Sequence, residues 1–282
     1  MKIAIFADVH ANLVALQAVV ESIHAWRPDH VVMAGDLVNR GPRPAECLRF
    51  FIEQQRAHGW LSVRGNHEDY VISHAHPGTP RHGPEFAVHQ ASYWTYTQLG
   101  EDVSALEAMP FQRSFSDPAG AEVRTVHASM LGNRHGIYPH TTDATLGELI
   151  CVPGAAAPAT LCVGHTHLPL VRSLDGTLVV NVGSAGLPFD GDPRPAYARL
   201  AWQHGAWHAR IVRVDYDLAQ AERDFYTTGY LTDAGPLIDL VLIELRLSRS
   251  LLYHWAIRYQ QPALRGEISM RQSVDRFITE FL

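Results

Sequence analysis

Polar side chains that can bind a metal ion follow several short apolar segments of this sequence. Asp8 and His10 come directly after the apolar run at residues 3–7. Four further groups follow later apolar runs: Gly35-Asp36, Gly65-Asn66-His67-Glu68, His127, and Gly164-His165-Thr166-His167. His165 and His167 are two residues apart, so they point to the same side of an extended chain. The recurrence of carboxylates and imidazoles at such places indicates a metal site.

Taken singly, most of these groups also have an ordinary structural explanation. Asp8-x-His10 is compatible with an Asx hydrogen bond in a turn at a strand end, and Gly35-Asp36 with a tight turn. His127 alone is compatible with a hydrogen-bonded core histidine. The occurrence of all five groups, each at the end of an apolar run, favours a common functional site over five separate structural roles.

The ligand types and their number indicate which metals to expect. Several carboxylates, four imidazoles and a carboxamide cannot be gathered away from water unless cations neutralise and orient them. Mixed nitrogen and oxygen ligands suit manganese, iron or zinc better than calcium or magnesium. The set is larger than the four ligands of a tetrahedral zinc. We therefore expect two divalent ions that share one bridging carboxylate.

The elements that position these groups alternate between strands and helices. Apolar runs typical of buried strands occur at 3–7, 30–34, 60–63, 123–126, 160–163 and 177–182. Helical patterns lie between them, most clearly at 13–26 and 44–58. This alternation predicts parallel strand pairing, in which the carboxyl ends of the strands share one edge. The glycines before the ligands are expected to let the backbone turn sharply there.

Two segments depart from this rhythm, and they suggest the domain organisation. Residues 68–110 are predicted to be a helical insertion, and a hairpin is expected at 196–214. We expect one domain over residues 1–215 and a helical extension over 216–282, with helices at 218–227, 236–258 and 268–281. The extension has more apolar residues than one helix face needs, so it is expected to pack on the domain or to form a homodimer contact.

Composition limits the classes of function. The chain has 282 residues, 46% hydrophobic and 18% charged, with a net charge of −6. This charge offers no basic face for duplex nucleic acid. The three cysteines have no metal-binding or disulfide spacing, no segment is typical of a signal peptide or a membrane span, and we expect a cytoplasmic protein with no membrane partner.

The set of motifs resembles the calcineurin-like metallophosphoesterase superfamily. The motifs are DxH at residue 8, GDxxxRG at 35, GNHE at 65, a lone histidine at 127 and GHTH at 164. They span about residues 1–185, and the stretch VVNVGSAGLPFDGDPRPAYARL and the insertion are similar to the small bacterial phosphodiesterase-like branch. The resemblance implies an α/β fold: a two-sheet β-sandwich core flanked by helices in αββα layers, here with the C-terminal helical extension.

The resemblance also implies roles for individual residues. One metal would be held by Asp8, His10, Asp36 and His167, and the second by Asp36, Asn66, His127 and His165, so that Asp36 bridges the two. His67 matches a catalytic histidine that lies beside the metals without binding them. Arg40 and Arg64 match arginines that bind the substrate phosphate in related branches.

Two positions depart from the family pattern. The glycine that usually follows DxH is Ala11 here, which would narrow the loop slightly. Asn39 replaces an aspartate that orients the catalytic histidine in the protein-phosphatase branch, so His67 should be less easily protonated. The second histidine of GHTH is absent from that branch, which ranks protein phosphatase below small-molecule phosphoesterase.

The activity implied is phosphoric ester hydrolysis with two divalent metal ions, manganese, iron or zinc. A metal-bridging hydroxide would attack a phosphodiester or nucleotide anhydride, and a phosphodiesterase is favoured over a phosphomonoesterase. The expected partner is a small phosphorylated, nucleotide-like substrate. The alternatives are a phosphomonoesterase or protein phosphatase, and a non-catalytic metal-binding scaffold protein.

Overall fold

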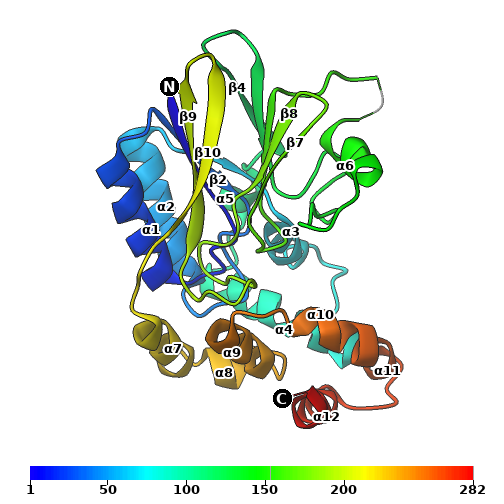
Figure 1. The fold of residues 1–282 in the computed structure, drawn as a ribbon. Coiled ribbons are helices and arrows are strands. Elements are labelled where there is room, and N and C mark those ends of the chain that lie inside the picture. Colours follow the sequence, from blue (N-terminus) through cyan, green and yellow to red (C-terminus); the bar gives the residue numbers. More distant parts are fainter. Residues whose placement is uncertain (153, 282) are drawn as a thin grey trace.

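Two five-stranded sheets packed face to face form the core of the computed structural model, which describes residues 1–152 and 154–281 (Figure 1). The first sheet has the order β10 (Ala206–Arg213), β9 (Ala196–Gln203), β1 (Lys2–Phe6), β2 (His30–Ala34) and β3 (Leu61–Val63). The second has the order β4 (Gln112–Ser116), β5 (Glu122–Val126), β6 (Thr160–Val163), β8 (Thr177–Asn181) and β7 (Leu170–Leu174). The predicted two-sheet sandwich is confirmed.

The pairing within each sheet is mixed, whereas the sequence predicted parallel strands. Parallel pairs join β1 to β2, β2 to β3, β5 to β6 and β6 to β8. The outer strands pair antiparallel: β9 with β1, β10 with β9, β4 with β5, and β7 with β8. The strands β4 and β7 were not predicted, because both lie at sheet edges and alternate exposed with partly buried residues.

Helices cover both outer faces of the sandwich. Helices α1 (Leu13–Trp26) and α2 (Pro44–His58) pack on the first sheet, where Leu16 and Phe51 meet Phe6 of β1. Helix α6 (Asp143–Ile150) covers the second sheet. Between the sheets lies a separate apolar layer that includes Ile5 of β1 and Cys162 of β6. This order of layers is the predicted αββα arrangement.

Further helices lie beyond the ends of the strands. After β3 come α3 (Asn66–Ser73), α4 (Gly83–Gln98) and α5 (Ser104–Glu107). The extension has α7 (Leu218–Thr227), α8 (Tyr230–Asp233), α9 (Ile238–Leu247), α10 (Leu252–Trp255), a π-helical turn at 256–260, α11 (Gln261–Leu264) and α12 (Met270–Phe281). Within the described residues, none of the helices combines the length and the apolar character needed to cross a bilayer.

The single helix predicted at 236–258 is wrong. Helix α9 ends at Leu247, where Ser248 adopts a left-handed conformation with φ of 51°. The buried Glu244 carboxylate then accepts hydrogen bonds from the backbone N–H groups of Leu251 and Leu252, at 2.6 and 2.8 Å. These bonds stabilise a turn that an apolar periodicity alone cannot indicate.

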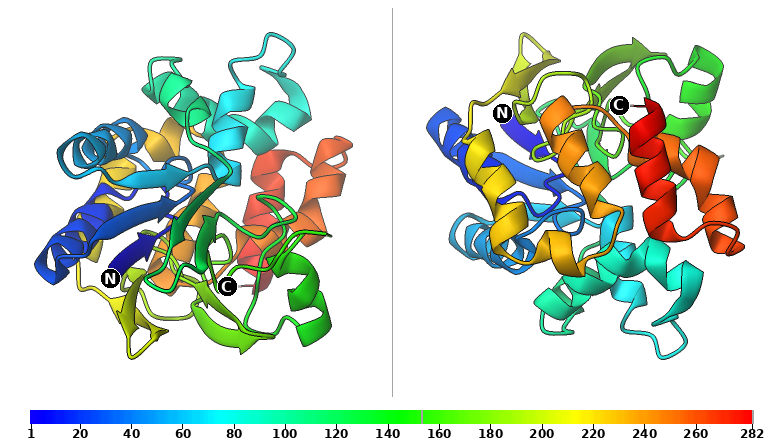
Figure 2. Two further views of the ribbon diagram at one scale, coloured as in Figure 1. Left: turned by 90° about the horizontal axis from the view of Figure 1, so that it is seen from above. Right: turned by 90° about the horizontal axis from the view of Figure 1, so that it is seen from below.

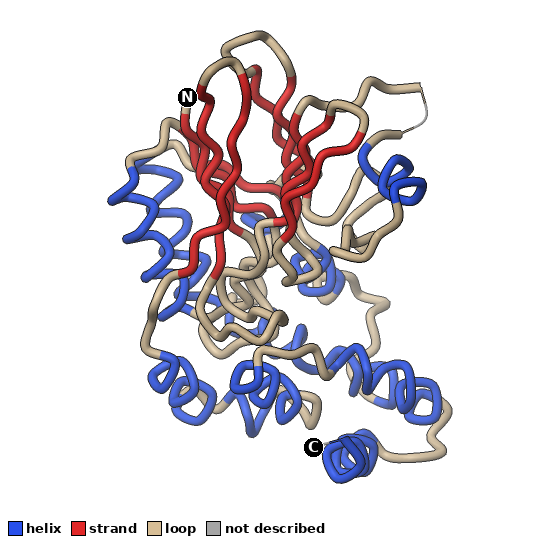
Figure 3. The backbone as a smooth tube through the Cα atoms, viewed as in Figure 1, coloured by secondary structure: helices blue, strands red, loops and turns tan. Residues whose placement is uncertain are grey.

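The C-terminal helices pack on the insertion and on the sandwich. Tyr230 and Val241 share an apolar cluster with Trp94 of α4 and with Leu187 from the loop after β8. A second cluster joins α9 and α12 to α4. The view from below in Figure 2 shows these helices laid across one end of the molecule, and Figure 3 shows loops between them and the strands. The ligand-bearing loops lie in this region.

Candidate metal centre

The polar groups at the strand ends converge on one place. Asp8 and His10 follow β1, Asp36 follows β2, and Asn66 opens α3 just after β3. From the second sheet, His127 follows β5, and His165 and His167 follow β6. All of these residues except His165 are buried. The parallel strands of each sheet end at the same edge, and the packing of the two sheets brings these two edges together.

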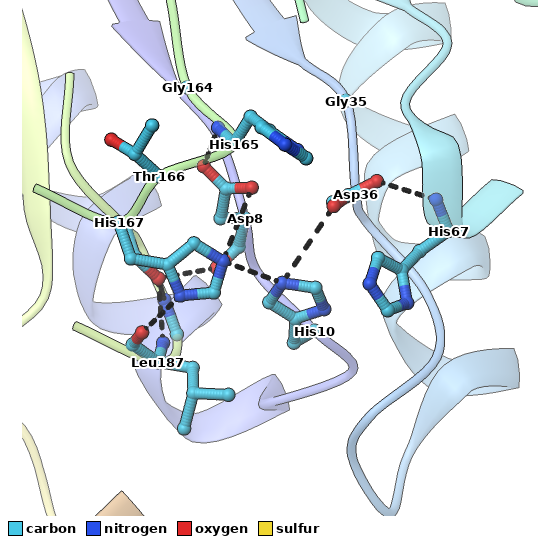
Figure 4. A network of polar contacts seen from close by, with 12 residues as sticks. Asp8, His10, Gly35, Asp36, His67, Gly164, His165, Thr166, His167 and Leu187 are labelled. Atoms are coloured by element: carbon cyan, nitrogen blue, oxygen red, sulfur yellow. Dashed lines mark hydrogen bonds and ion pairs between the residues drawn. The ribbon is translucent and has the colours of Figure 1, made fainter. Parts of the chain in front are cut away.

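Asp8, His10 and His167 form the first half of the centre (Figure 4). The Nε2 atoms of the two histidines lie 3.0 Å apart, and the Nε2 atom of His167 is 3.5 Å from Oδ1 of Asp8. The Nδ1 atoms are hydrogen-bonded to backbone carbonyls, that of His10 to Asn39 at 3.3 Å and that of His167 to Leu187 at 2.5 Å. Each ring therefore presents Nε2 to the same point.

Asp36, Asn66, His127 and His165 form the second half. The Nε2 atom of His127 lies 3.3 Å from Oδ2 of Asp36 and 3.0 Å from Oδ1 of Asn66. His165 presents Nδ1, which is 2.9 Å from the same Asn66 oxygen. The Nδ1 atom of His127 is held by the carbonyl of Ala34 at 2.8 Å, so this ring also has Nε2 free to bind a metal.

Asp36 lies between the two halves. Its Oδ1 accepts a hydrogen bond from the backbone N–H of His67 at 2.9 Å. Its Oδ2 is 3.3 Å from Nε2 of His127 and 3.8 Å from Nε2 of His10, which belong to different halves. A carboxylate with one oxygen anchored and the other facing both histidines has the arrangement that a bridging ligand requires.

The residues present fit a cation at this place. Oδ2 of Asp8 accepts the backbone N–H of His165 at 2.8 Å, but Oδ1 is buried and has no hydrogen-bond partner among the described residues. An unsatisfied carboxylate oxygen in the interior is costly. Ring nitrogens without a proton between them repel each other at 3.0 Å, and a divalent ion between them would remove both penalties.

The charges of the site respond to burial and to one another. Burial raises the pKa of Asp8 well above its usual range. Burial opposes ionisation of Asp36 too, but the surrounding imidazoles, His127 foremost, hold its pKa well below the usual range. Against its own burial, the Asp36 carboxylate raises the pKa of His127 to about 10. Burial lowers the pKa of His10 and His167 well below the usual value, which leaves both rings neutral.

His67 lies beside this centre, and Asn39 selects the tautomer of its ring. The Oδ1 atom of Asn39 accepts the backbone N–H of Arg40 at 2.8 Å, so its amide nitrogen faces Nδ1 of His67, 2.9 Å away. Nδ1 therefore accepts, and the ring proton is on Nε2. Burial lowers the pKa of His67 to about 3, as expected without a carboxylate partner. His10, Asp36 and His67 also form a third group of ligand atoms close enough to hold a metal ion.

Glu68 has a structural role that was not predicted. A glutamate in the first turn of a helix ordinarily complements the helix dipole, but the Glu68 side chain is fully buried. Its carboxylate accepts the backbone N–H groups of Asp36 and Leu37, both at 2.8 Å, and of Gly65 at 2.9 Å. Glu68 thus holds the Asp36 loop against α3. The spacing of Gly65 and Glu68, which matches a capping box, was the available signal.

The glycines serve the site mainly by leaving space. Three glycines precede predicted ligands: Gly35, Gly65 and Gly164. Of these three, only Gly35 has a left-handed backbone conformation, with φ of 89°. A Cβ atom at Gly65 would lie 2.2 Å from Oδ1 of Asp36, and one at Gly164 would lie 2.5 Å from Oδ2 of Asp8. These two glycines have ordinary backbone angles, so the expectation of a sharp turn was wrong there, and close approach is the reason for them.

Backbone strain is concentrated at the same loops. Asp8, His10, Asp36, His165 and His167 all have φ between 50° and 69°, in the left-handed region. Ala11, Asn39 and Arg40 share this conformation. Such angles are costly for residues with a side chain and persist where the surroundings impose them, which is common at functional sites.

The two arginines expected to bind phosphate lie in different surroundings. Arg40 lines the cavity over the centre, which has a volume of about 930 Å³, together with Asp36, His67 and His165. Within the described part of the chain, the Arg40 side chain has no ion pair. Arg64 does not line this cavity, and its Nε lies 3.0 Å from Oδ1 of Asp69.

Comparison with known proteins adds to this geometry. The family model for the calcineurin-like phosphoesterase superfamily domain matches residues 1–205. A metallophosphoesterase from Sphaerobacter thermophilus has a similar structure, with a TM-score of 0.67 and 30% identity over 88% of this chain and 99% of that one. An uncharacterised protein of Methanocaldococcus jannaschii is 28% identical over 248 residues, 78% of this chain and 89% of its own. A hypothetical protein from Pyrococcus horikoshii shares the fold, with a TM-score of 0.70 and 18% identity over 84% of this chain and 97% of that one.

Proposed function

The chain belongs to the calcineurin-like phosphoesterase superfamily, and on that premise we propose that it hydrolyses a phosphodiester or a nucleotide anhydride with two divalent metal ions. The observation that carries the proposal is the pair of facing ligand groups on either side of Asp36. Three histidines have Nδ1 fixed by a backbone carbonyl, so their Nε2 atoms are oriented before any ion binds.

Each ion would have its own set of ligands. Asp8, His10 and His167 would hold one ion, and Asn66, His127 and His165 the other, with Asp36 between them. When bound, the two cations would lower the pKa of a coordinated water toward neutrality and neutralise the phosphoryl oxygens. Manganese, iron and zinc all suit this nitrogen and oxygen set, and manganese is the ion to test first.

His67 and Arg40 would act on the substrate directly. With Nδ1 accepting from Asn39, His67 keeps its proton on Nε2 and stays neutral, since its pKa is lowered to about 3. It would then donate a hydrogen bond to a phosphoryl oxygen rather than transfer a proton to the leaving group. Arg40 would bind a remaining phosphate oxygen through its guanidinium. The role of Arg64 in phosphate binding is the weaker part of the proposal, because it pairs with Asp69.

The size of the cavity favours an extended, nucleotide-like substrate over a simple monoester. Its volume of about 930 Å³ is at the upper end for small-molecule sites, which are about 300–1,000 Å³. A phosphomonoester or protein-phosphatase activity remains the alternative, together with a non-catalytic scaffold. We also infer a cytoplasmic location from the cysteine pattern; it stays a prediction.

Hydrolysis of bis-p-nitrophenyl phosphate by the manganese-loaded protein tests the proposal. We expect turnover in the full chain and a loss of at least about a thousandfold in Asp36→Asn, because the bridging charge is removed. Elemental analysis should find two ions per chain. Asp175→Asn, an exposed turn residue far from the centre, is the matched control and should keep both properties.

Two results would contradict the proposal in different ways. Full activity of Asp36→Asn would remove the bridging role. Bound metal without hydrolysis of monoesters, diesters, cyclic nucleotides or dinucleoside polyphosphates would instead support the scaffold alternative.

A further inference from the structure

The C-terminal extension forms the far wall of the cavity over the metal centre. The near wall has the ligands Asp36 and His165 together with His67, whereas Arg249, Tyr253 and Arg258 line the opposite side. These last residues lie in the turn after α9, in α10 and in the π-helical turn. The sequence motifs give this wall no role, although it faces the reacting centre.

The far wall has positive charge that no carboxylate neutralises. Among the described residues, Arg249 and Arg258 form no salt bridge, and Asp36 is the only carboxylate lining the cavity. Within the described part of the chain, the Arg258 guanidinium donates only to the carbonyl of His254, at 3.4 Å. Two free guanidiniums facing a cavity favour an anionic ligand group beyond the one that the metals would bind.

The same wall presents flat aromatic surfaces. The Arg258 guanidinium lies 4.1 Å from the ring centroid of Phe281, and Phe281 stacks on Phe277 at 4.9 Å and 30°. On the opposite side of the cavity, Tyr138 stacks on His140 at 5.3 Å and 29°. Stacked rings on both sides, with a guanidinium plane on one of them, suit a planar aromatic ligand.

The two sides are close and are held in place. Tyr138 and Tyr253 both line the cavity, and burial, and then the Tyr253 phenol, raises the pKa of Tyr138. The carbonyl of Ser248 accepts the backbone N–H of Gly191 at 3.0 Å, which ties the turn after α9 to the sandwich. Arg43 at the start of α2 forms an ion pair of 2.9 Å with Asp224 of α7. The wall is therefore preformed.

From this wall we infer that the C-terminal extension binds the part of the substrate on the far side of the scissile phosphate, and that this part is an aromatic, negatively charged group of the nucleotide class. The inference rests on the proposed function and names the substrate class of the same site. The Arg258 guanidinium, backed by the Phe281 ring, would stack on the base, and Arg249 would bind a further phosphate. The cavity has the volume to hold both ends of such a molecule.

Two esters with the same leaving group test this inference. The p-nitrophenyl ester of thymidine 5′-monophosphate has a nucleoside, whereas methyl p-nitrophenyl phosphate lacks one. We expect Arg258→Ala to raise KM for the nucleoside ester about tenfold, with kcat little changed, and to leave kcat/KM for the methyl ester within about twofold. Arg276→Ala on the exposed face of α12 is the matched control and should alter neither ester.

Equilibrium binding of thymidine 5′-monophosphate to the metal-loaded chain gives a second measurement. Arg258→Ala should weaken this binding about tenfold, and Phe281→Ala should weaken it in the same direction. Equal effects on both esters, or no effect on either, would overturn the inference and leave the hydrolase proposal intact. A failure of the wild-type protein to hydrolyse either ester would instead contradict the proposed function, and it would do so whatever the binding shows.

Discussion

At the scale of single residues, the centre depends on groups that bind no metal themselves. Backbone carbonyls of Asn39, Ala34 and Leu187 hold three imidazoles through Nδ1. Such contacts select the tautomer and orient the ring, and their loss commonly lowers metal affinity by about tenfold or more. A carbonyl has no side chain to recognise in a motif, so its contribution becomes visible only once the loops are placed.

Metal binding should release protons at neutral pH. Although burial opposes it, the Asp36 carboxylate raises the pKa of His127 to about 10, so this ring holds an additional proton at pH 7 in the metal-free protein and must lose it to bind a metal. Metal affinity should therefore rise with pH, by about tenfold per unit for each proton released. Calorimetric titration with manganese at pH 7, in buffers of different ionisation enthalpy, measures the number of protons.

A variant and a control make the origin of these protons testable. His127→Gln should release about one proton fewer than the wild type. His208→Gln, on strand β10 away from the centre, should release the same number. A heat of binding that does not depend on the buffer would show that the ligands are already deprotonated.

At the scale of elements, the site depends on loops at the strand ends that are hydrogen-bonded to one another and to α3. The Asp36 loop after β2 is held by the side chain of Glu68 from α3, through backbone N–H groups. Asp8 donates its backbone N–H to the carbonyl of Gly35 at 3.0 Å, so the loops that follow β1 and β2 are also joined. The proposed ligands are thus positioned by hydrogen bonds between elements rather than by each loop alone.

Glu68→Gln should weaken the hydrogen bonds that join the Asp36 loop to α3. One of the carboxylate oxygens would become an NH₂ group facing N–H donors, so buried donors would lose their acceptor at a cost of about 1–3 kcal/mol. We expect a lower free energy of unfolding in urea and weaker manganese binding. Glu21→Gln, an exposed change on α1, should alter stability by less than about 0.5 kcal/mol. Unchanged stability and metal affinity in Glu68→Gln would show that the Asp36 loop keeps its conformation without the Glu68 carboxylate.

At the scale of the whole molecule, the extension uses most of its apolar surface internally. Val274 and Phe277 of α12 are buried against α9 and α4, and Tyr230 is buried against Trp94. Of the large apolar residues that stay exposed in the described extension, Leu247, Tyr253 and Phe281 line the cavity. The other two exposed apolar residues of the described extension, Tyr226 and Ile257, lie outside the cavity. Of the two arrangements open from the sequence, packing on the domain therefore explains the apolar content.

We accordingly expect a monomer in solution. Two exposed side chains are far short of a stable interface, which buries about 1,200–2,000 Å². Sedimentation velocity should give a single compact species whose coefficient does not change with protein concentration, and the extension should resist protease. A dimer that forms as concentration rises would contradict this, and its loss in Ile257→Ser would locate the contact on the extension.

The sequence by itself determined which residues to propose for the candidate metal centre and their order along the chain, and the structure brings these residues together. An apolar run that stops at a carboxylate or an imidazole is a local pattern, and so are the helices at 13–26 and 44–58, which the structure reproduces as α1 and α2. The periods of strand and helix are short, so a few neighbouring residues suffice to predict them.

Only the tertiary structure decided how these parts meet. The edge strands β4 and β7, the break at Ser248 and the buried position of Glu68 each depend on contacts that form only when elements pair or pack: with β5 and β8, with the Glu244 carboxylate, and with the Asp36 loop. The same holds for the cavity, whose near wall comes from the strand-end loops and whose far wall comes from residues 247–281. The physical reason is that burial and hydrogen-bond pairing are properties of packed surfaces, and the sequence specifies each surface without stating which other surface it will contact.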